Sequence, residues 1–255
     1  MINYQLPMIN NKFRPYLFQL AYVVIGLIVL VSVSWFSKNL DINPTILTLI
    51  LFLIGYVCLA YFLKVLPSLK AYWSLKKIYL LVIGYVAGII IQAIPILLTQ
   101  SIPLSKAMFL FSFYQIAIFS IFFTFFTVLW EELWFRNPIL NLAESKNQKI
   151  LLSVFTGLLF ALLHLMNPKI NLLHDGLELF LAGVLLTISY YASKSFWLPL
   201  GLHFGNNIFS RLIEKMNFDT AGVGITNELV LRWVVLAISI GITFLYWPKM
   251  KKDTV

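Results

Sequence analysis

Apolar runs follow one another along the whole chain and are separated by short polar links. A helix of about 20 apolar residues crosses the roughly 30 Å hydrocarbon core of a bilayer. Eight runs approach or exceed this length, namely Leu17–Phe36, Thr45–Leu63, Ile78–Leu98, Ala107–Arg136, Ile150–Met166, Leu177–Tyr191, Phe196–Ile213 and Leu229–Trp247. The pattern predicts an all-α, polytopic membrane protein with about eight transmembrane helices in one bundle. The fourth run is too long for one straight crossing, so we expect it to be tilted, broken or extended beyond the lipid.

The composition supports a single membrane domain. Of the 255 residues, 60% are hydrophobic and 11% are charged, whereas about 25% of residues are charged in an average soluble domain. We therefore expect residues 1–255 to form one integral membrane domain. The net charge is +9, but the basic residues are scattered through short links, a distribution that suits membrane orientation and does not favour nucleic-acid binding.

The basic residues also predict an orientation. Eight crossings place both termini on the same side of the membrane, and most of the lysines and arginines fall in the links on that side. Links rich in Lys and Arg remain in the cytoplasm. We therefore expect a multi-pass protein of the cell membrane with both termini cytoplasmic.

Three short patterns bring ionisable groups into these apolar runs. Charged side chains at membrane depth cost on the order of 2.5 to 3.5 kcal/mol each and usually mark a functional site. The patterns are Glu131-Glu132-x-x-x-Arg136, Phe160-x-x-x-His164 and His203-x-x-x-Asn207. Residues four apart share a helix face. Each pattern alone is weak evidence, but together they predict a hydrolytic site inside the membrane.

The spacing of the runs predicts that these residues meet. Residues equally far from the turn of a helical hairpin lie at one depth, and the link 143–149 is centred between Glu131 and His164. His203 follows Lys194 by nine residues, roughly 14 Å of helix. Asn207 lies one turn deeper. We expect all four side chains in the cytoplasmic half of the membrane.

The chemistry of these groups fits the hydrolysis of a carbonyl compound by water. A carboxylate away from bulk water accepts a proton readily, so Glu131 suits a general base, and His164 would orient the water or share its proton. His203 and Asn207 suit the stabilisation of an oxyanion. Arg136 is expected to pair with Glu132 and to support the helix. The nucleophile motif G-x-S-x-G is absent.

These three motifs resemble those of the CPBP family of intramembrane proteases, also called the CAAX protease, bacteriocin-processing or Abi family. The resemblance covers the motif-bearing core, residues 107–213. It implies an eight-helix membrane fold and an endopeptidase whose site contains Glu131, His164, His203 and Asn207. Many members have glycine after the motif arginine, whereas this chain has Asn137, which puts the local turn in doubt more than the activity.

Cofactor and substrate stay open at this point. Two glutamates, two histidines and an asparagine are able to bind zinc, but the zinc-protease motif H-E-x-x-H is absent. We expect that no cofactor is required and keep zinc as the alternative. The expected partners are the lipid bilayer and a peptide or lipidated protein substrate.

Other functions and roles compete with this interpretation. A non-catalytic immunity or regulatory factor would keep the same fold and bind a membrane partner, and a transporter also uses buried Glu and His. The Glu-Glu pair would alternatively be a structural ion-pair cluster with Arg136. Four polar residues are expected to have no role in the site: Asn206 facing another helix, Asp175 in a loop with His174, and Glu178 and Glu228 near helix ends.

Overall fold

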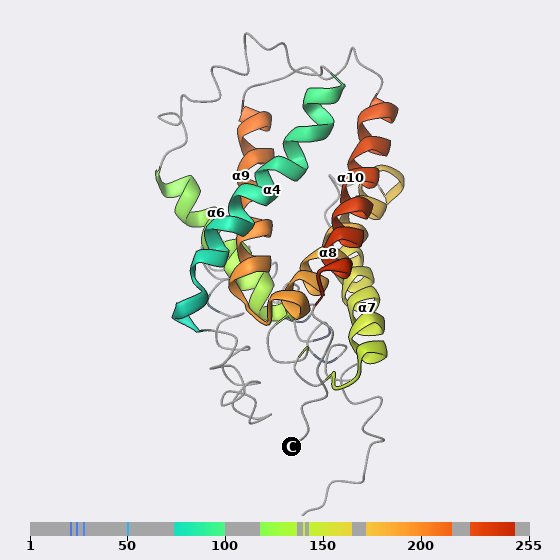
Figure 1. The fold of residues 1–255 in the computed structure, drawn as a ribbon. Coiled ribbons are helices and arrows are strands. Elements are labelled where there is room, and N and C mark those ends of the chain that lie inside the picture. Colours follow the sequence, from blue (N-terminus) through green and yellow to red (C-terminus); the bar gives the residue numbers. More distant parts are fainter. Residues whose placement is uncertain are drawn as a thin grey trace, which may run out of the picture.

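The described residues form helices and no strand (Figure 1). The computed structural model describes residues 74–99, 118–136, 140, 143–164, 172–215 and 225–247, with Ala21, Val24, Ile28 and Ile50, and gives the backbone alone at 118–120, 172–174, 212–215 and 225–226. The elements are η1 (Leu75–Lys77), α4 (Tyr79–Leu98), α6 (Ile118–Arg136), α7 (Lys146–His164), α8 (Leu172–Ser193), α9 (Trp197–Lys215) and α10 (Ile225–Leu245). The all-helical prediction is confirmed for this part of the chain.

Four of the described helices are long and apolar enough to cross a membrane. They span Leu75–Leu98, Lys146–His164, Asp175–Ser193 and Asn227–Leu245. The first two expected spans, 17–36 and 45–63, lie almost entirely outside the described residues. The described part thus has several apolar helices, as a multi-pass membrane protein requires, while the expected total of eight stays a prediction.

Helices α7, α8 and α10 begin four or five residues earlier than the sequence pattern predicts. Helix α7 begins at Lys146 because Ser145 and Gln148 form a capping box: the Gln148 amide donates to Ser145 Oγ at 3.2 Å, and Gln148 Oε1 accepts from the Ser145 amide at 2.9 Å. Helix α8 begins at Leu172, so Asp175 lies in its first turn and not in a loop. An acidic residue there interacts favourably with the positive end of the helix dipole.

Opposed glycines bring α4 and α9 into close contact, and the two helices lie side by side in Figure 1. Gly84 and Gly88 on α4 face Gly201 and Gly205 on α9, each pair in the spacing G-x-x-x-G. A Cβ at any of these four positions would overlap backbone atoms of the other helix. Small residues at this spacing allow membrane helices to pack at backbone distance. His203 lies between the two glycines of α9, so this packing fixes its position.

A second glycine contact joins α7 to α8. A Cβ on Gly157 would lie 2.8 Å from the Phe180 carbonyl oxygen, and one on Gly183 would lie 2.8 Å from Gly157 Cα. The helix that carries His164 is therefore held against α8 in the same way as the helix that carries His203 is held against α4.

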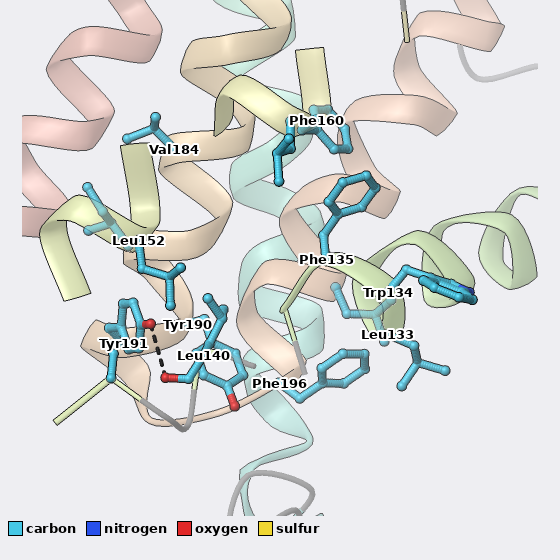
Figure 2. Packing of buried hydrophobic residues seen from close by; sticks show 14 of the residues in the cluster. Leu133, Trp134, Phe135, Leu140, Leu152, Phe160, Val184, Tyr190, Tyr191 and Phe196 are labelled. Carbon is cyan, nitrogen blue, oxygen red and sulfur yellow. Dashed lines mark hydrogen bonds between the residues drawn. The ribbon is translucent and has the colours of Figure 1, made fainter. Parts of the chain in front are cut away.

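The apolar core lies where the end of α6 meets α7, α8 and the start of α9. Figure 2 shows aromatic and aliphatic side chains from α6, α7 and α8 in this cluster, among them Phe135, Leu152 and Tyr190, together with Phe196, which directly precedes α9. The Tyr191 hydroxyl donates to the Leu140 carbonyl at 3.0 Å, as the dashed line marks. This core anchors the last turn of α6, which carries the acidic motif.

We predict that Gly84→Ala lowers the thermal stability of the purified protein in detergent. The new methyl group would overlap the Leu198 carbonyl on α9, and overpacking costs about 1 to 3 kcal/mol. Gly241→Ala is the matched control, because a Cβ at Gly241 meets no atom within 4 Å and alanine has the higher helix propensity. Thermal unfolding of both variants gives the comparison. Equal unfolding temperatures would contradict the packing argument.

Candidate active site

A buried ion pair closes the end of α6. Glu132 and Arg136 are both fully buried, lie four residues apart and form an ion pair. Buried charges are tolerated only when they are paired. The Arg136 guanidinium also lies over the Phe160 ring, 5.1 Å from its centroid, so the pair connects α6 to α7.

Glu132 also holds His203. Its Oε1 lies 2.7 Å from His203 Nδ1, and the His203 side chain is 5% exposed. A carboxylate only accepts hydrogen bonds, so Nδ1 carries the proton. This contact joins α6 to α9 and turns Nε2 of His203 away from Glu132.

Glu131 faces both motif histidines. Its Oε2 lies 3.5 Å from His203 Nε2 and 3.9 Å from His164 Nε2. Neighbouring residues point about 100° apart on a helix, which explains why Glu131 faces the histidines while Glu132 faces Arg136. The structure thus brings together three of the four residues that the sequence predicts to be catalytic.

His164 is oriented by its own helix. Its Nδ1 lies 2.8 Å from the Phe160 carbonyl oxygen. A carbonyl only accepts, so Nδ1 carries the proton and, in the neutral ring, Nε2 offers a lone pair on the side of Glu131. Phe160 packs against both imidazoles, with ring centroids 4.2 Å from His164 and 5.7 Å from His203. It therefore fixes the separation of the two histidines.

A cavity of about 690 Å³ lies against these groups. His164 and His203 line it together with Asn207, which lies one turn further along α9. Asn206 lines the same cavity, and its Nδ2 donates to Asn207 Oδ1 at 3.4 Å. The expectation that Asn206 faces another helix is therefore wrong: both amides lie at the cavity wall.

A second group of polar residues, which the sequence pattern does not predict, lies in this cavity. Gln92 from α4, Asp175 and Glu178 from α8, and Arg232 from α10 line its wall. Arg232 pairs with Glu178 at 3.4 Å and with Glu228 at 2.7 Å. The i,i+4 spacing of Glu228 and Arg232 was the available signal, whereas nothing local in the sequence links Gln92 to Glu178.

The donor atoms that meet at this site are carboxylate oxygens and imidazole nitrogens. Among the residues that the structure describes, no group of three or more His, Cys, Asp or Glu side chains is arranged to hold a metal ion. Oε2 of Glu131 and Oε2 of Glu132 are buried and accept no hydrogen bond from a described residue. The arrangement offers one carboxylate, that of Glu131, and two oriented imidazoles.

Comparison with known proteins points to one family. Residues 113–209 match the family model described as type II CAAX prenyl endopeptidase Rce1-like. The matched stretch contains all three motifs. No curated protein matches the chain.

We predict that Arg136→Met destabilises the protein by about 3 to 5 kcal/mol, because Glu132 would keep a buried charge without its cation. The double variant Glu132→Gln/Arg136→Met removes both charges and is expected to be more stable than Arg136→Met alone. Lys76→Met, at an exposed lysine, is the control for the loss of a positive charge. Thermal unfolding in detergent measures all three. A double variant no more stable than the single one would contradict the ion-pair argument.

Proposed function

We propose that the protein is an intramembrane endopeptidase whose water nucleophile is activated by Glu131, because its residues 113–209 match the family model of the Rce1-like CAAX proteases. The family implies protease activity in general. The proposal adds the base, the supporting groups and the mechanism.

The convergence of Glu131 with His164 and His203 supports the proposal most directly. The Nε2 atoms of both histidines lie within 3.9 Å of Glu131 Oε2, although the three residues come from three helices. Glu132 and Arg136 neutralise each other beside them. One carboxylate is thus left to face two imidazoles at the edge of a cavity, which is the arrangement that base catalysis requires.

In the proposed first step, Glu131 removes a proton from a water molecule. Its Oε2 accepts no hydrogen bond from a described residue and is therefore available to the water. The lone pair of His164 Nε2 accepts the second hydrogen of the same water and sets its direction. The resulting hydroxide attacks the peptide carbonyl carbon, and the protonated Glu131 later gives its proton to the leaving amine.

The negative charge on the tetrahedral intermediate is proposed to be stabilised by His203 and Asn207. The Asn207 amide supplies an N–H donor from the cavity wall. His203 donates from Nε2 when both ring nitrogens carry protons, with Nδ1 held by the Glu132 carboxylate. Removal of one such donor typically slows acyl transfer by about 10²- to 10³-fold.

The cavity and the membrane setting support a proposal for the substrate class. A volume of about 690 Å³ is in the range of pockets that enclose small molecules or short segments. We propose a membrane-associated peptide or a prenylated protein tail as substrate, cut at or within the bilayer of the cell membrane. Both termini are proposed to lie in the cytoplasm.

We predict that Glu131→Gln lowers the rate of peptide cleavage by at least about 10²-fold, because the amide cannot accept the proton from water. Unfolding temperature is expected to change little, since the Glu131 side chain is 27% exposed and outside the Glu132–Arg136 pair. The measurement is cleavage of a peptide library by the purified protein, followed by mass spectrometry.

Glu144→Gln is the matched control, because Glu144 is an exposed carboxylate outside the cavity, and it is expected to cleave at the wild-type rate. Retained cleavage by Glu131→Gln would rule out Glu131 as the base. A cellular function that survives Glu131→Gln together with His203→Ala would identify a non-catalytic binding protein instead.

We predict that removal of metal ions leaves cleavage unchanged, because the proposed base is a carboxylate that acts on unbound water. The purified protein is treated with 1,10-phenanthroline, desalted and assayed, with a zinc protease such as thermolysin as the positive control for chelation. Loss of cleavage that zinc restores would establish the zinc alternative and overturn this mechanism.

A further inference from the structure

The two proposed oxyanion donors, His203 and Asn207, each need a fixed orientation. A carboxamide has an N–H end that donates and a carbonyl end that accepts, and the two ends have almost the same shape. Rotation of the Asn207 side chain by half a turn would place its carbonyl oxygen, and not its N–H, beside the oxyanion. The proposed mechanism therefore requires neighbours that select one orientation of each group.

Glu132 selects the orientation of His203. Its Oε1 lies 2.7 Å from Nδ1 of the imidazole, and this contact leaves Nε2 on the side of Glu131, 3.5 Å from Oε2 of that carboxylate. The ring is thus held at the nitrogen that faces away from the proposed reaction. Contacts of this kind, made behind a reacting group, are what keep a site in its productive geometry.

Asn206 makes the corresponding contact with Asn207. Its Nδ2 donates to Asn207 Oδ1 at 3.4 Å, and among the residues that the structure describes this is the one hydrogen bond of the Asn207 side chain. Neighbouring residues point about 100° apart on a helix, yet both amides line the same cavity. Because Oδ1 of Asn207 is held by Asn206, Nδ2 of Asn207 is the end that remains for a ligand in the cavity.

Helix packing holds the backbone from which Asn206 makes this contact. A Cβ on Gly88 of α4 would lie 2.9 Å from the Asn206 backbone nitrogen, so α4 and α9 touch at this residue. The Asn206 carbonyl also accepts a hydrogen bond from Ser210 Oγ at 3.0 Å. The Asn206 side chain therefore starts from a fixed position at the cavity wall, as a residue that orients its neighbour requires.

We propose that Asn206 is a positioning residue, which holds the Asn207 carboxamide by its carbonyl end so that the Asn207 N–H faces the oxyanion of the tetrahedral intermediate. The inference rests on the proposed function and deepens it by one residue. Asn206 acts through Asn207 and does not touch the reacting atoms. Its loss is therefore expected to lower kcat and to leave KM unchanged, because the oxyanion exists only after attack on the carbonyl.

The test compares Asn206→Leu with Asn206→Gln in the purified protein, on a library peptide that the wild-type protein cuts. Leucine cannot donate a hydrogen bond, whereas glutamine keeps the carboxamide. We expect Asn206→Leu to lower kcat about threefold to tenfold, the effect of one lost hydrogen bond, and Asn206→Gln to retain most of the wild-type kcat. Asn147→Leu is the matched control, because Asn147 is exposed and outside the cavity, and it is expected to cleave at the wild-type rate.

A double-mutant cycle separates positioning from direct contact with the substrate. Asn207→Ala is expected to lower kcat by about 10²- to 10³-fold, as the removal of an oxyanion donor does. In that background Asn206→Leu is expected to cause no further loss, because the group that Asn206 orients is gone. A further loss as large as that of Asn206→Leu alone would mean that Asn206 acts on its own and would overturn the proposal. Asn206→Ala takes its place in the cycle if Asn206→Leu unfolds.

The outcome is distinguishable from failure of the proposed function. A wild-type kcat in Asn206→Leu, a raised KM with kcat unchanged, or a kcat in Asn206→Gln as low as in Asn206→Leu would each reject the positioning role, while cleavage by the wild-type protein retains the protease function. Cleavage of no library peptide by the wild-type protein would reject the proposed function and this inference with it.

Discussion

The buried contact between Glu132 and Arg136 is the constraint on which the rest of the site depends. Both groups are fully buried, so neither tolerates the loss of the other. Glu132 extends the contact to His203 on α9, and Arg136 extends it to Phe160 on α7. A single ion pair therefore connects three helices at the point where Glu131 meets the two histidines.

Close packing of backbones provides the other half of the geometry. The glycines of α4 and α9 bring these helices together on either side of His203, while Gly157 and Gly183 hold α7 against α8. Within each pair, α4 with α9 and α7 with α8, the backbones are in close contact, whereas the two pairs are further from each other. The cavity lies between the pairs, lined by residues of both pairs and of α10. Small residues thus determine where the open volume lies, and polar residues determine its chemistry.

The sequence predicted the acidic motif and the two histidines because their signals are local. Spacing of four residues places Glu132 beside Arg136 without knowledge of the fold. The sequence did not place Gln92 beside Glu178, since that contact exists only after glycines bring α4 and α9 together and α8 packs beside them. Asp175 was assigned to a loop because polar neighbours masked the start of α8. Both failures concern contacts or helix ends that tertiary packing decides.

Two adjacent glutamates in one helix have separate tasks because they point in different directions. Glu132 points to a cation and an imidazole Nδ1 and is fully buried. Glu131 points to two imidazole Nε2 atoms and is partly exposed. If both carboxylates faced the cavity, their like charges would repel each other. Arg136 neutralises Glu132, so one carboxylate, that of Glu131, faces the two histidines. The structural pair is therefore a condition for the proposed base, even though it takes no part in the proton transfer.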